Sequence, residues 1–173
     1  MTVAARLKAT LDARGIPYEV IPHVIDGSAP ETAAHTHTPG RQFAKAVVVR
    51  GGKGYAMVVV PAHHRVDLQR VGEAIGHAGD AALAAEEEIA RLCPDCERGA
   101  VPPFGELYGL AVVVSEELSR EPRITFNAGS HEEAIRMSYR DWAALVKPRV
   151  AHISSIPRGG ESSSPSPQSA EPR

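Results

Sequence analysis

Apolar residues recur along the chain with two different periods, and these periods separate expected helices from expected strands. Val3, Leu7 and Leu11 lie at helical spacing and Gly15 follows them, so an amphipathic helix is expected over residues 3–14. A second stripe consists of Leu68, Val71 and Ile75. Asp67 directly precedes this stripe and is expected to cap its helix. Further helical segments are expected at 30–34, 83–92 and 141–146.

Two valine-rich runs, residues 44–50 and 55–60, predict strands, and the Gly-Gly-Lys-Gly between them predicts a hairpin. Because both runs are almost continuously apolar, we expect their sheet to be covered on both faces. In residues 134–139, Ile135 and Met137 alternate with polar residues, as in a half-buried strand. Other strands are expected at 18–23, 108–114 and 124–126.

Two segments do not fit either period. Residues 93–107 contain three prolines and two glycines and are expected to form an irregular loop. From residue 154 the chain is rich in Ser and Pro, which predicts a disordered tail at 154–173. Helices and strands otherwise mix without a strict βαβ rhythm. The sequence therefore predicts an α+β fold, a single compact domain at 1–153 with a central mixed β-sheet flanked by helices.

Composition narrows the class of protein. A chain of 173 residues with 43% apolar residues suits one domain with a real core. No run reaches the roughly 18 apolar residues of a membrane helix, and the charged N-terminus does not resemble a secretory signal. Two cysteines are too few for a disulfide framework. A cytoplasmic protein without a membrane partner is expected.

The charge pattern argues against a protein that wraps DNA or a long RNA duplex. The net charge is −2 and the pI is about 6.4. Residues 40–55, however, contain Arg41, Lys45, Arg50 and Lys53 and no acid. This basic edge predicts contact with a few phosphates at most.

Three places carry candidate chemistry, and each also has a plain structural interpretation. Lys45 begins an apolar strand, where its ammonium either reaches solvent at an edge or binds a phosphate or a developing negative charge. The stiff loop around Gly99, Pro102 and Pro103 is either a rigid connection or a cradle of inward N–H groups. His131 follows a turn of small residues and is either structural or orients a substrate amine or a water.

Metal, thiol and triad chemistry have weaker support. Cys93 and Cys96 form one Cys-x-x-Cys pair without a second pair, which disfavours a zinc site, and prolines and glycine follow it where a redox dithiol needs a helix. The nearest possible partners are His63 and His64, at a spacing that does not recommend them. His35 and His37 are close enough in the sequence to bind one metal ion jointly, but only in principle. A Gly-x-Ser-x-Gly sequence is absent, so a serine triad is not supported.

Three segments taken in order resemble one family: GRQFAKAVVVR (40–50), CERGAVPPFGELYGLAVVV (96–114) and FNAGSHEEAIRMSYRDW (126–142). The chain is similar to the YbaK/prolyl-tRNA synthetase editing-domain family of aminoacyl-tRNA deacylases, in particular to its free-standing branch, from about residue 4 to 150. The resemblance implies a compact α+β fold and hydrolysis of mischarged tRNA in trans. It implies the tRNA acceptor end as partner and neither a metal nor an organic cofactor.

The resemblance also assigns roles to residues of this chain. It implies that Lys45 is required for activity and that the Gly-x-x-x-Pro loop starting at Gly99 lines the site at the aminoacyl ester. It implies that the turn ending at His131 shapes the amino-acid pocket. The expected catalytic residues are Lys45 and Gly99, and the expected substrate-binding residues are Ala100, Val101, Pro102, Pro103, Gly129, Ser130 and His131.

The expected substrate is a mischarged tRNA that carries a small amino acid, since Ala, Gly and Val would line a narrow pocket. One departure from the family is Ser115, where many relatives have an aspartate. It motivates the alternative of a catalytically inactive module that binds a tRNA end or a nucleotide. A hydrolase of other activated acyl esters, or a thiol or metal protein built on Cys93 and Cys96, are the remaining alternatives. The amino acid, the tRNA and the oligomeric state are not determined by the sequence.

Overall fold

The computed structural model describes residues 2–22 and 38–157. The helix expected at 30–34, the histidines at 35 and 37 and residues 158–173 of the expected tail lie outside the described residues. Within the described part of the chain, no helix is long and apolar enough to cross a membrane.

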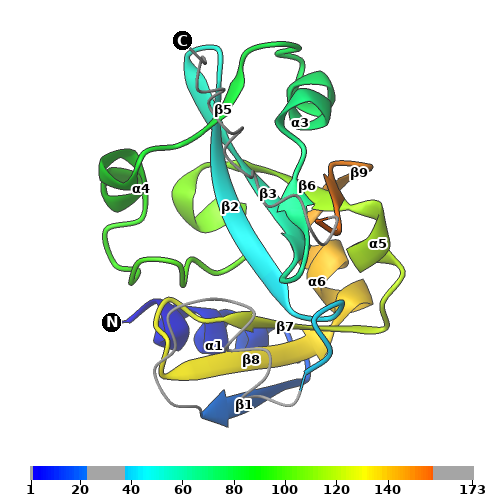
Figure 1. Cartoon of the computed structure of the whole chain (residues 1–173). Helices are drawn as coiled ribbons and strands as arrows, with labels where there is room; N and C mark the ends of the chain where they lie inside the picture. Colours follow the sequence, from blue (N-terminus) through cyan, green and yellow to red (C-terminus); the bar gives the residue numbers. More distant parts are fainter. Residues whose placement is uncertain (1, 23–37, 158–173) are drawn as a thin grey trace, which may run out of the picture.

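A five-stranded mixed sheet forms the centre of the fold (Figure 1), with the strand order β5-β2-β3-β6-β9. The predicted hairpin is confirmed, because β2 and β3 pair antiparallel through the full length of both strands. β3 pairs with β6 and β6 with β9 in parallel, so the sheet is mixed, as expected. The strands are β5 (Ala81–Leu83), β2 (Ala44–Gly51), β3 (Gly54–Pro61), β6 (Ala111–Ser115) and β9 (Arg149–Ala151).

Both faces of this sheet are buried, which explains the nearly continuous valine runs. Val48 and Val59 belong to a core that also contains Leu7 of α1 (Val3–Ala13). Their sequence neighbours Val49 and Val58 face a second core, which is covered by α3 (Leu68–Ile75). Each valine of the hairpin therefore has an apolar environment on its own side of the sheet.

A smaller antiparallel sheet with the order β1-β8-β7 packs on α1 at one end of the large sheet (Figure 1). Its strands are β1 (Tyr18–Pro22), β8 (Glu133–Ser138) and β7 (Arg123–Asn127). Ile135 and Met137 of β8 join the core that contains α1, as their alternation predicted. A bridge between Phe43 and Thr125 joins the two sheets just before β2 begins.

The remaining elements cover the edges and faces of the sheets. The predicted cap of α3 is confirmed, since Asp67 Oδ1 accepts a hydrogen bond from Arg70 N–H at 3.2 Å. The short β4 (Arg65–Val66) pairs with β10 (Ser154–Ser155) near the end of the described chain. The other helical elements are α4 (Glu86–Leu92), the 3₁₀ turn η1 (Gly105–Tyr108), α5 (Glu116–Ser119) and α6 (Tyr139–Val146).

Several element boundaries differ from the sequence expectation, and tertiary pairing or a turn explains three of them. The helix expected at 83–92 begins only at Glu86, because residues 81–83 form β5 and pair with β2. The strand expected at 108–114 begins at Ala111, since Gly109 ends the preceding 3₁₀ turn with φ +68°. Strand β10 lies beyond the expected domain boundary at 153 because Ser154 is buried and paired.

Candidate functional site

A pocket of about 480 Å³ lies where one edge of β2 is left without a neighbouring strand. β5 pairs with β2 only from Val49 to Gly51, and the last contact on this side is the hydrogen bond from Ala84 N–H to Val48 O at 3.0 Å. The pocket walls come from β2, from α4 and its approach, and from the two loops that the sequence singled out. They include Ala46, Val48, Ile89, Gly99, Val101 and His131.

The two candidate loops are hydrogen-bonded to each other through their backbones. Glu97 N–H donates to Gly129 O at 2.8 Å, and Gly129 N–H donates to Ala100 O at 2.9 Å. Gly129 has φ +92°, and a Cβ at this position would lie 2.8 Å from Val3 Cβ. Only glycine therefore lets this loop approach both the other loop and α1.

The side chain of His131 adds a second connection between the loops. Its Nε2 lies 2.7 Å from Arg98 O, and its backbone N–H donates to Glu97 Oε2 at 3.0 Å. Because a carbonyl oxygen only accepts, Nε2–H is the donor of this bond, and Nδ1 is the second ring nitrogen. That nitrogen is buried, and none of the described residues donates to it. Sequence reasoning did not find Glu97, which no pattern distinguishes from the neighbouring acids.

The backbone N–H groups of the glycine loop differ in their partners. Ala100 N–H donates to Glu97 O at 3.0 Å and closes a turn. The N–H groups of Gly99 and Val101 have no acceptor among the described residues, and both residues line the pocket. Gly99 has φ +76°, a conformation that favours glycine. Two donors are thus available at the pocket wall.

Five of the expected binding residues do not line this pocket. Pro103 O accepts a hydrogen bond from Trp142 Nε1–H at 2.9 Å, and Pro102 O accepts one from Phe104 N–H at 2.8 Å. Pro103 thus anchors the loop to α6, while the bond of Pro102 stays within the loop. Gly129 and Ser130 line a separate cavity of about 550 Å³ next to the start of α1. Ala100 is fully buried behind the pocket wall.

Lys45 is not among the residues that line the pocket. It precedes Ala46, which is a lining residue, and its Nζ donates a hydrogen bond to His64 O at 2.7 Å. Burial lowers the pKa of Lys45, and the nearby Arg65 lowers it further. The structure therefore brings Gly99, Val101 and His131 together around one cavity, while Lys45 belongs to the strand that forms one wall of this cavity and directs its ammonium to His64 O.

The expected basic edge is less positive than the sequence indicates. Arg41 pairs with Glu121 at 3.3 Å and Arg50 pairs with Glu88 at 3.4 Å, so acids distant in sequence offset two of its four cations. The sequence could not reveal these pairs because the partners come from other elements.

Ser115, the departure from the family pattern, is fully buried and caps α5. Its Oγ accepts a hydrogen bond from Leu118 N–H at 3.2 Å. Serine and aspartate are both favoured at this position of a helix, so the serine preserves the cap that an aspartate would make.

Cys93 is buried and Cys96 is half-buried, and neither cysteine lines the pocket. Burial raises the pKa of Cys93 to about 12, and Cys96 Sγ lies 2.9 Å from Tyr108 Oη. Of the residues that the structure describes, no group of three or more His, Cys, Asp and Glu side chains is placed to hold a metal. His64 bonds instead to Ser154, with Nδ1 and Oγ 2.8 Å apart.

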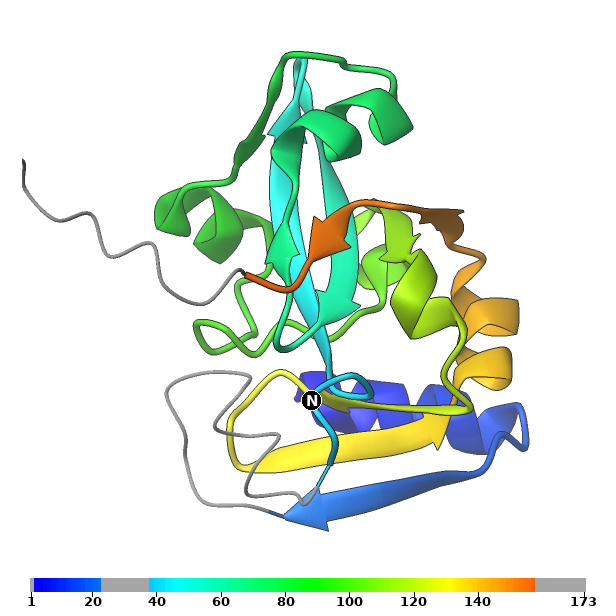
Figure 2. The same ribbon diagram turned by 45° about the vertical axis from the view of Figure 1, so that its right-hand side comes forward.

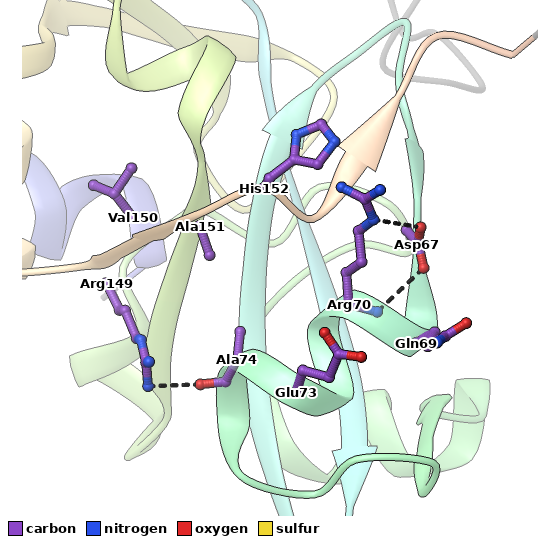
Figure 3. Close-up of a pocket in the computed structure, with 9 residues that line it drawn as sticks. All are labelled: Asp67, Gln69, Arg70, Glu73, Ala74, Arg149, Val150, Ala151 and His152. Atoms are coloured by element: carbon purple, nitrogen blue, oxygen red, sulfur yellow. Dashed lines mark hydrogen bonds and ion pairs between the residues drawn. The ribbon is translucent and has the colours of Figure 1, made fainter.

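A larger cavity of about 720 Å³ lies between α3 and β9 (Figure 3). None of the catalytic or substrate-binding residues expected from the sequence lines this cavity. Both arginines that line the cavity bind neighbouring groups of the protein: Arg70 pairs with Asp67 at 3.3 Å, and Arg149 donates to Ala74 O at 2.8 Å. We therefore place the candidate site at the edge of β2.

Solved structures share this fold over nearly their whole length. A candidate trans-editing enzyme for prolyl-tRNA synthetase is 25% identical with a TM-score of 0.75, covering 90% of this chain and 98% of that chain. The hypothetical protein APE2540 is 21% identical with a TM-score of 0.77, covering 86% and 99%. A scaffold protein used in epitope backbone grafting is 24% identical with a TM-score of 0.77, covering 90% and 98%.

A search among curated proteins finds no significant match. The family model of the aminoacyl-tRNA editing domain, in contrast, matches residues 27–145. This range contains Lys45, both hydrogen-bonded loops and every wall of the pocket. The chain therefore belongs to the aminoacyl-tRNA editing domain family.

Proposed function

We propose that this protein is a trans-acting deacylase that hydrolyses the ester between a small amino acid and the wrong tRNA. The observation that supports the proposal is the pair of hydrogen-bonded loops, with Gly99, Val101 and His131 around one pocket and Lys45 in the strand that forms one of its walls. The family to which the chain belongs acts on aminoacyl-tRNA, and this supports the same substrate class here.

The proposed chemistry needs no strong nucleophile, because an aminoacyl ester is already an activated acyl group. The N–H groups of Gly99 and Val101 hold the carbonyl oxygen and stabilise the negative charge that develops on it when water attacks. Lys45 binds the phosphate of the terminal nucleotide or the developing charge. The free ribose hydroxyl of the substrate orients the attacking water, so positioning replaces a side-chain base.

The pocket supports selection by size. Its volume of about 480 Å³ is typical of a small-molecule site, for which the general range is roughly 300–1,000 Å³. Ala46 and Ala84 provide short side chains, while Ile89 and Val101 limit the space between the walls. A hydrophobic pocket distinguishes two amino acids that differ by one methylene by only about 1–3 kcal/mol. A synthetase whose correct amino acid has a slightly smaller competitor therefore needs a second site that removes the wrong product.

The charge of the protein supports a limited tRNA footprint. The net charge is −2, and ion pairs offset part of the basic edge around β2. Because affinity for a nucleic-acid backbone depends on unpaired cations, we propose that contact is confined to the acceptor end.

A deacylation panel tests the proposal directly. Several tRNAs charged with amino acids of increasing size are incubated with the wild-type protein, with Lys45→Ala and with Lys53→Ala. Lys53 is an exposed lysine of the neighbouring hairpin turn and serves as the matched control. We expect cleavage of the small aminoacyl esters by the wild type and by Lys53→Ala, and a loss of more than about 100-fold in Lys45→Ala.

Other results of the panel would contradict the proposal in distinct ways. Saturable tRNA binding without ester cleavage would identify a non-catalytic binding module. Cleavage of other activated acyl esters, with none of aminoacyl-tRNA, would identify a different hydrolase. Cleavage of large aminoacyl groups only would refute the small substrate, and full activity of Lys45→Ala would refute the role of the lysine.

A further inference from the structure

The ammonium group of Lys45 is held by a backbone carbonyl rather than by an acid. Its Nζ donates to His64 O at 2.7 Å, and no carboxylate of the described residues pairs with it. Whatever fixes the carbonyl of residue 64 therefore fixes the ammonium of Lys45. The turn that contains this carbonyl follows β3, where His64 N–H donates to Pro61 O at 2.9 Å.

The side chain of His64 is anchored by a residue from the end of the described chain. Its Nδ1 lies 2.8 Å from Ser154 Oγ, and the two side chains belong to buried residues that are 6% and 1% exposed. Burial lowers the pKa of His64, and the adjacent His63 lowers it further, so the ring is neutral at neutral pH. Burial removes the hydration of both the hydroxyl and the imidazole, and the bond between them compensates for this loss, so each side chain depends on the other.

Ser154 is itself held in place from both sides. In β10, Ser154 pairs with Val66, and the preceding Ile153 is fully buried and accepts a hydrogen bond from Asp67 N–H at 2.7 Å. Figure 2 shows this orange segment crossing in front of the central strands, and Figure 3 shows it beside the segment that carries Asp67. β10 lies outside residues 27–145, which match the family model.

We propose that Ser154 and His64 are positioning residues for Lys45: the serine fixes the histidine ring, and the histidine backbone carbonyl then holds the ammonium in place. The C-terminal strand β10 is thus a functional part of the site, although it contacts neither the pocket nor the substrate. This inference rests on the proposed function for its effect on turnover, but its geometric part concerns Lys45 alone.

The geometric part is tested on the free protein by the NMR titration of the Lys45 side chain. Ser154→Ala is compared with Ser155→Ala, an exposed serine of the same strand, and with the wild type. In Ser154→Ala the turn loosens and water reaches the ammonium, so we expect the pKa of Lys45 to rise toward its ordinary value. In Ser155→Ala we expect the pKa of Lys45 to equal that of the wild type. If Ser154→Ala does not fold, Ser154→Cys, which is similar in size and bonds more weakly, replaces it in the same comparison.

Turnover is measured on the same variants. We expect Ser154→Ala to lower the deacylation rate by about tenfold, the equivalent of one hydrogen bond, and Ser155→Ala to leave it unchanged. A Lys45 titration that is the same in folded Ser154→Ala as in the wild type would overturn the positioning role, whatever the activity. A shifted titration in a protein that cleaves no aminoacyl-tRNA at all would support the positioning and refute the proposed function.

Discussion

His131 Nε2–H donates a hydrogen bond to the carbonyl oxygen of Arg98 at 2.7 Å, across a sequence separation of 33 residues. This bond joins a conformationally constrained loop to a turn that follows β7. Gly99 comes directly after the acceptor residue Arg98. The bond from His131 therefore fixes the backbone just before the unpaired N–H groups of Gly99 and Val101. The role of His131 is therefore to shape the glycine loop, in addition to forming part of the pocket wall.

His131→Ala should weaken deacylation more than it weakens the fold. The variant loses the donor to Arg98 O and frees the loop that carries the proposed carbonyl-binding N–H groups. We expect a decrease of about 10- to 100-fold in turnover and a loss of about 1–2 kcal/mol in the free energy of unfolding. Initial rates and urea denaturation measure the two effects. Ser130→Ala is the neighbouring control, and a loss of activity there equal to that of His131→Ala would argue against the bond.

Alanine substitutions at Gly99 and Gly129 should have different consequences for stability. Both glycines have positive φ, at +76° and +92°. At Gly99 a Cβ would make only ordinary contacts, at 3.8 Å from the His131 ring, so we expect a cost of about 1–2 kcal/mol from the backbone alone. At Gly129 a Cβ would lie 2.8 Å from Val3 Cβ, so α1 must move and the cost should be clearly larger.

Denaturation curves of the two glycine variants provide the measurement. The prediction is that Gly129→Ala loses more free energy of unfolding than Gly99→Ala. A Gly129→Ala protein as stable as Gly99→Ala would contradict the close approach of this loop to α1.

Ser115→Ala should affect the fold and not the chemistry. The variant removes the N-cap of α5, for which we expect a loss of about 1 kcal/mol in the free energy of unfolding. Deacylation should stay at the wild-type level, because Ser115 does not line the pocket. Thermal melts and the deacylation assay test both statements. A strong decrease in turnover with an unchanged melting temperature would instead assign this position to the site.

Cys93 should make the protein less stable at alkaline pH. Its pKa is raised from 9.0 to about 12, since burial disfavours the thiolate. The protonated thiol therefore contributes stability that is fully present below pH 9, and that is lost as the pH rises from 9 through 12. Urea denaturation at pH 8 and at pH 10.5 should show a smaller alkaline loss in Cys93→Ala than in the wild type. Equal losses in both proteins would contradict this assignment.

The periodicity of apolar residues was sufficient to predict most of the elements. Buried side chains include Leu7 and Leu11, which lie at helical spacing, and valines on both sides of the hairpin turn. Their burial follows from a periodicity that can be recognised within one segment of the sequence. Boundaries were less predictable where tertiary pairing decides them. Residues 81–83 became a strand because β2 offers them a partner, and Ser154 joined the fold because β4 and His64 bind it.

By itself, the sequence determined the kinds of element, the buried hairpin and the residues whose ordered resemblance indicated an editing domain. Only the tertiary structure decided that the two loops bind each other through Glu97 and Gly129, that Pro103 anchors its loop to α6 instead of lining the pocket, and that the ammonium of Lys45 lies against His64 O. The physical reason is that periodicity reports burial, which is a property of each segment. A hydrogen bond between loops depends on the relative position of segments far apart in the chain, and this position exists only once the core has packed.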